Sequence, residues 1–130
     1  MLKQISLTLW GVTFLLVLGV GMLRAEERVT GEEAEKVRNV MESYVKQDST
    51  LKGGFLIYDE KGNKVLNLKY DHVHKGVEKT ESDEYFACVD FVDSNKNTYD
   101  IDVYVGKKGE EWDITKLVIH KVNAKDRLKK

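Results

Sequence analysis

Three aspartates and the chain's single cysteine fall in two stretches whose apolar and polar residues alternate, residues 85–92 and 98–105. Such alternation is typical of strands with one buried face, and antiparallel pairing of the apolar faces fixes the register of the polar ones. The polar face then carries two opposed pairs: Asp90 with Asp100, and Cys88 with Asp102. Three carboxylates on one patch repel each other. This predicts a site for a cation or a basic partner, or paired acids with separated pKa values; the alternative is a solvated face softened by lysines.

Two aromatic residues, Phe86 and Tyr104, fall on the same face and opposite one another. An apolar surface beside acids is typical of a docking site, although the loop 75–83 or a chain tail could instead bury it. We therefore predict that this face binds a protein or a small ligand, unless a pocket between helix and sheet does so. The candidate binding residues are Phe86, Asp90, Asp100, Asp102 and Tyr104.

His72 and His74 lie two residues apart in a predicted strand, residues 65–74, so both point the same way and could hold a metal ion. Strict alternation puts them on that strand's apolar face. The sequence pattern does not indicate a third ligand, and His120 could approach the two histidines only if the strand at 112–122 lies nearby. The alternative is a pair of exposed or hydrogen-bonded histidines at a strand end.

Cys88, being alone, excludes an internal disulfide and a Cys-rich zinc module. Its expected neighbours are acids, which raise the pKa of a thiol, so we do not expect a nucleophile. The sequence has no Gly-rich phosphate loop, nucleophile elbow, Ser-x-x-Lys or His-Glu-x-x-His motif. We assign no catalytic residue and no cofactor, and a non-catalytic protein is favoured over an enzyme.

Composition limits the remaining classes. The 130 residues are 42% hydrophobic and 33% charged, which indicates one folded domain. The 21 basic and 22 acidic residues give a net charge of -1, so a nucleic-acid partner is not expected.

The first 25 residues differ from the rest, because they hold no acid and only two bases. An uncharged run at residues 5–23, followed by Ala25, resembles a secretory signal peptide, and it is also long enough to span a bilayer as an anchor. Either interpretation places a domain of net charge -3 outside the cytoplasm, periplasmic or secreted. Membrane contact is expected only through residues 5–23, if they are retained.

Residues 26–122 should form the domain. Thr30 and Glu33 make a capping box for an amphipathic helix that fades near residues 48–50. Strands are predicted at 55–58, 65–74, 85–92, 98–105 and 112–122, a loop at 75–83, and a frayed basic tail at 123–130. The fold class is α+β, with one N-terminal amphipathic helix packed on a curved antiparallel sheet of about five strands.

This order of elements, with Thr98-Tyr99-Asp100-Ile101-Asp102-Val103, Trp112-Asp113-Ile114 and Leu117-Val118-Ile119, resembles the cystatin-like and nuclear-transport-factor-like group of small domains. The resemblance covers about residues 30–122, and many secreted bacterial members end in such a strand. PepSY domains are a second resemblance. The group's fold serves enzymes, inhibitors and assembly modules alike, so the resemblance implies a fold. The Gln-x-Val-x-Gly loop of cystatin inhibitors is absent from the sequence.

We expect an exported, non-catalytic binding or assembly module whose ligand the sequence does not identify. One alternative is a small enzyme or metal-binding protein that uses His72, His74 and nearby carboxylates. The other is a membrane-tethered assembly factor, which requires that residues 1–25 stay attached.

Overall fold

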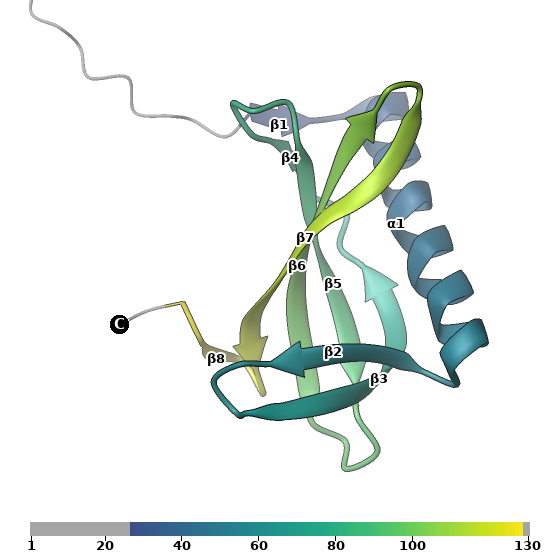
Figure 1. Cartoon of the computed structure of the whole chain (residues 1–130). Helices are drawn as coiled ribbons and strands as arrows, with labels where there is room; N and C mark the ends of the chain where they lie inside the picture. Colours follow the sequence, from purple (N-terminus) through teal and green to yellow (C-terminus); the bar gives the residue numbers. More distant parts are fainter. Residues whose placement is uncertain (1–26, 129–130) are drawn as a thin grey trace, which may run out of the picture.

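The computed structural model describes residues 27–128, so the predicted export segment, residues 1–25, lies outside the described residues. One N-terminal helix packs against a strongly curled antiparallel sheet (Figure 1), which confirms the α+β class. The elements are β1 (Glu27–Val29), α1 (Gly31–Lys52), β2 (Phe55–Asp59), β3 (Lys64–Val73), β4 (Val77–Lys79), β5 (Tyr85–Val92), β6 (Thr98–Lys108), β7 (Glu111–Val122) and β8 (Lys125–Asp126). Between residues 27 and 128, no helix is long and apolar enough to cross a membrane.

Helix α1 begins after Thr30, as predicted, but the capping box is wrong. The Thr30 side chain makes no capping hydrogen bond to any described residue, and the Glu33 carboxylate instead accepts a hydrogen bond from the Tyr85 hydroxyl. The helix also runs past residues 48–50, to Lys52, and ends where Gly53 takes a φ of 74°. That left-handed residue is the usual helix stop.

Strand β5 organises the sheet, because two strands share one of its edges. β3 pairs with the second half of β5 and β4 with its beginning, while β6 pairs along the other edge. The full path is β1-β4-β5-β6-β7-β8, with β2 joined to β3. The predicted loop at 75–83 therefore contains a strand, β4, whose pairing with β1 the sequence pattern did not indicate.

The concave face of the sheet and the apolar stripe of α1 form the core. Phe91 stacks on Phe55 with ring centroids 5.0 Å apart and meets the edge of Tyr70 at 6.3 Å. The inward faces predicted for β5 and β6 are confirmed. Their buried residues are Tyr85, Ala87, Val89, Phe91, Tyr99, Ile101, Val103 and Val105.

The C-terminal segment is not frayed over residues 123–128, where the prediction was wrong. It turns back as β8 beside β7, and Arg127 donates two hydrogen bonds to Asp59 at the end of β2, Nη1 to Oδ1 at 3.2 Å and Nη2 to Oδ2 at 2.6 Å. Asp59 is only 3% exposed. This ion pair ties β8 to β2, which lie side by side in Figure 1.

Two strands contain an extra residue that changes which face the following side chains occupy. In β3 the pairing moves from Tyr70–Phe91 to His72–Asp90, which leaves Asp71 as a bulge. In β7 the pairing moves from Ile119–Ile101 to Lys121–Asp100, which leaves His120 as a bulge. Bulges bend a strand and re-aim its side chains. The prediction that His72 and His74 lie on the apolar face is therefore wrong, because His72 is opposite Asp90 on the outer face and His74 contacts the same carboxylate.

Candidate metal centre

The candidate binding residues lie together on the outer, convex face of β5 and β6. The predicted register is confirmed in all three pairs: Phe86 with Tyr104, Cys88 with Asp102, and Asp90 with Asp100. Successive pairs are two residues apart along each strand, so the six side chains form a row on the outer face. Side chains from β7 border this row on one side. On the other side, β4 borders the Phe86 end and β3 borders the Asp90 end.

Four metal-ligating side chains meet at the centre of this face. Each of them offers one ligand atom, and these atoms all lie within 4.8 Å of one another. The Cys88 thiol donates to Asp102 Oδ1 at 3.1 Å, and His120 Nδ1 lies 3.3 Å from the same oxygen. Asp102 is only 6% exposed. We call this group the inner cluster; its members are Cys88, Asp100, Asp102 and His120.

The bulge in β7 is what brings His120 to Asp102. The other ring nitrogen, Nε2, lies 3.9 Å from Asp126 Oδ2 on β8, and the backbone N–H of Leu128 donates to Asp126 Oδ1 at 2.7 Å. A metal-binding histidine commonly has a carboxylate near its second nitrogen, because that partner fixes the ring and makes the ligand more basic. The imidazole of His120 is thus held between two carboxylates in the manner of a metal ligand.

The inner cluster is electrostatically unfavourable without a cation. Burial raises the pKa of the Cys88 thiol, and the hydrogen bond to Asp102 and the charges of Asp102 and Asp100 raise it further. Asp100 Oδ1 is buried and accepts no hydrogen bond from any of residues 27–128. A buried acceptor without a partner is costly. A divalent cation here would satisfy that oxygen and displace the thiol proton, because a metal ion reverses the local pKa balance.

The inner cluster suits zinc by its donor types and size. Thiolate, imidazole and carboxylate are the ligands of Zn²⁺, which binds them in a tetrahedron with ligand atoms about 3.3–3.8 Å apart. The His120–Asp102 contact, at 3.3 Å, already has that spacing, and the Cys88–Asp102 contact, at 3.1 Å, is slightly shorter. A pair of ligand atoms at the upper limit of 4.8 Å would need to approach by about 1 Å to reach that spacing.

A second group lies beside the inner cluster and is more exposed. His74 Nε2 lies 3.0 Å from Asp90 Oδ1, and His72 Nε2 lies 3.5 Å from Asp90 Oδ2. The two imidazole rings stack with centroids 5.3 Å apart, and the side chains of His72 and His74 are 56% and 40% exposed. We call His72, His74 and Asp90 the outer cluster. The carboxylate beside the two histidines that the sequence did not locate is therefore that of Asp90.

Phe86 and Tyr104 form the apolar end of the same face. Their rings stack with centroids 5.1 Å apart, and Lys116 Nζ lies 5.2 Å from the centre of the Tyr104 ring. Both aromatic residues are half-buried. The structure thus brings all five candidate residues into one row, with the aromatic pair next to Cys88 and Asp102 rather than inside either cluster.

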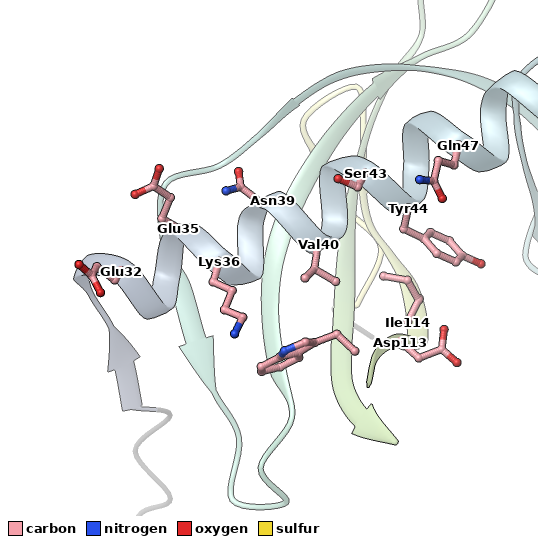
Figure 2. Close-up of a pocket in the computed structure, with 11 residues that line it drawn as sticks. Glu32, Glu35, Lys36, Asn39, Val40, Ser43, Tyr44, Gln47, Asp113 and Ile114 are labelled. Atoms are coloured by element: carbon pink, nitrogen blue, oxygen red, sulfur yellow. The ribbon is translucent and has the colours of Figure 1, made fainter. Parts of the chain in front are cut away.

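A pocket between helix and sheet is also present (Figure 2), with a volume of about 550 Å³. Lys36, Val40 and Tyr44 of α1 line its helix side, and Ile114 lines it from β7. The Trp112 ring that lines it is engaged by Tyr85 and by the Lys107 ammonium. The pocket carries charges of both signs, and none of the groups of three or more metal-ligating side chains found among the described residues lies in it.

Sequence alternation did not place His120 beside Asp102, and it misplaced His72 and His74, although the sequence contains a signal for the bulges that move them. The core-facing residues of β7 are spaced by two and then by three, and each step of three marks a bulge. The same step occurs in β3 between Tyr70 and Val73. The inward residues of β7 are Trp112, Ile114, Leu117, Ile119 and Val122.

Comparisons with known proteins give no assignment for this chain. No protein-family model matches it, and neither a curated protein nor a solved structure matches it significantly.

Proposed function

We propose that this domain is an exported, non-catalytic binding module whose ligand is a divalent transition-metal ion, Zn²⁺, held by the inner cluster. The observation that carries the proposal is the convergence of one thiol, one imidazole and two carboxylates within 4.8 Å. Export rests on the sequence of residues 1–25, and the relationship to cystatin-like and nuclear-transport-factor-like domains is proposed for the fold alone. A mature N-terminus at Glu26 would support secretion, and an intact residue 1 would support the tethered form.

Zinc is favoured over the hard cations by the ligand set. Mg²⁺ and Ca²⁺ take six or more oxygen ligands, and the inner cluster offers two carboxylates with a sulfur and a nitrogen. Four protein ligands would complete the coordination sphere of a tetrahedral zinc ion. Sites whose coordination sphere is complete store or carry an ion or stabilise the fold, whereas catalytic zinc sites keep one position open for water. This is why we propose binding and not catalysis.

The test is zinc binding by the full chain, purified without a polyhistidine tag in mild detergent and stripped with a chelator. Titration against a chromophoric chelator should find one tightly bound Zn²⁺ per chain. Replacing Zn²⁺ by Co²⁺ should give the absorption of a tetrahedral, thiolate-bound ion. Cys88→Ser, which keeps the side-chain size, should abolish the thiolate band and lower affinity at least about 100-fold, as loss of a direct ligand requires.

The matched control removes a carboxylate outside the clusters. Asp113 on β7 is half exposed and pairs with Lys108 at 3.2 Å, so Asp113→Asn should leave zinc affinity within about twofold. Asp100→Asn should lower the affinity by at least about tenfold. The proposal is wrong if the stripped chain binds no zinc, or if Cys88→Ser and His120→Ala both bind it as tightly as the parent.

A further inference from the structure

We infer that the outer cluster is an exchange site through which zinc reaches the inner cluster. This inference rests on the proposed function, because it requires the inner cluster to hold the ion. It adds a second metal site of different character, together with a role for it in loading.

The outer cluster has the composition of a labile site. It supplies two imidazoles and one carboxylate, which leaves a tetrahedral ion one position for water or a delivering ligand. His72 Nδ1 lies 3.2 Å from Asp71 Oδ2, so this imidazole also has a supporting carboxylate. The high exposure of the two rings lets an ion enter from solution. An inner ion, bound by half-buried side chains and the nearly buried Asp102, would leave more slowly.

The two clusters meet at one pair of residues. Asp90 of the outer cluster is directly opposite Asp100 of the inner cluster, and residues opposed in this way have Cβ atoms about 5 Å apart. The Asp90 carboxylate can therefore pass an ion to Asp100 by rotating about its own side-chain bonds. No movement of the backbone is needed for such a transfer.

A hollow of about 320 Å³ connects the opposed pair to solvent. Its charged lining consists of three carboxylates, Asp71, Asp90 and Asp100, and one ammonium, Lys121, with His74 beside them. A concave surface with an excess of negative charge concentrates cations and raises their association rates. The hollow thus joins an exposed zinc ligand to an inner one through an acidic passage.

The experiment measures how fast the inner cluster fills. Stripped full chain is mixed rapidly with Co²⁺, and the thiolate–cobalt band reports arrival at Cys88. His72→Gln with His74→Gln should slow loading about tenfold, the lower end of what local concentration of an ion achieves, and should leave the equilibrium affinity of the inner cluster within about twofold. Thr98→Ala, which changes another residue lining the hollow, should load at the parent rate.

A second variant guards against misfolding of the first. Asp90→Asn keeps the size of the side chain and should also slow loading, without lowering the urea midpoint. Loading at the parent rate in both variants overturns the exchange role and leaves the proposed function standing. Absence of the thiolate–cobalt band even at saturating Co²⁺ overturns both. With the inner cluster disabled by Cys88→Ser, one weakly bound Zn²⁺ should remain and should disappear with His72→Gln and His74→Gln.

Discussion

Replacing Asp100 by asparagine should stabilise the metal-free protein, although the residue lies in the middle of the sheet. Asp100 Oδ1 is buried and accepts no hydrogen bond from residues 27–128, and Asp90 lies opposite it. An amide is neutral and can donate to a neighbouring carboxylate. The substitution therefore removes a repulsion and adds a donor, whereas most substitutions of half-buried residues lose a contact.

The size of the effect follows from the geometry. Ligand atoms of Asp100 and Asp102 lie within 4.8 Å, so with an effective dielectric constant of about 20 two carboxylate charges repel by about 3 kcal/mol. Asp100 is half-buried and Lys121 lies opposite it, so solvent and this ammonium screen most of that energy. We expect a net gain of about 1 kcal/mol in the free energy of unfolding, or about 4–8 °C in Tm.

Urea unfolding of the stripped full chain in the presence of a chelator measures this gain. Asp113→Asn, which removes an exposed carboxylate paired with Lys108, should change the unfolding free energy by less than about 0.5 kcal/mol. Zinc at a concentration of about 100 times its Kd should stabilise the parent by about 2.7 kcal/mol and Asp100→Asn by clearly less. A loss of about 1 kcal/mol or more in metal-free Asp100→Asn would refute the electrostatic reasoning.

Two further predictions concern the C-terminal ion pair and the thiol. Arg127→Ala should lower the free energy of unfolding by about 3 kcal/mol, because it leaves the buried Asp59 carboxylate without its cation. In the same urea titration, Lys61→Ala, which removes an exposed ammonium, should lower it far less. Equal losses in the two variants would contradict this. Since the pKa of Cys88 is raised in the metal-free chain, its alkylation by iodoacetamide at pH 8 in the presence of a chelator should be far slower than in the urea-unfolded chain and should still climb with pH above 9. The unfolded thiol ionises first, so Cys88 should also make stability fall as pH rises above about 8.5; an alkylation rate that levels off between pH 8 and 9 would be inconsistent with the raised pKa.

The pairing of β5 with β6 could be predicted from sequence. The turn between them is short, and apolar and polar residues alternate regularly in both strands, so only one register buries both apolar faces. A shift by one residue would expose Val89 and Ile101 and bury Asp90 and Asp100. The faces of Cys88 and Asp102 follow from that single choice. Part of the chemistry at the centre of the site could therefore be predicted from the order of residues in two strands.

The histidines could not be placed in the same way, because strict alternation fails at a bulge. One extra residue, Asp71, moves His72 to the outer face, and His120 is itself the extra residue in β7. Strands β1, β4 and β8 were missed for another reason. They are only two or three residues long, which is too short to show a periodic pattern, so only their pairing with neighbouring strands defines them.

The bulges also bear on how such a site could arise during evolution. An inserted codon in β3 or β7 adds one outward residue, and the apolar residues on both sides, such as Tyr70 and Val73, still pack against the core. The core therefore tolerates the insertion, while the outer face gains a histidine next to an existing row of acids. In this fold, metal ligands can be acquired by small changes in strand length, without a new loop and without rebuilding the interior.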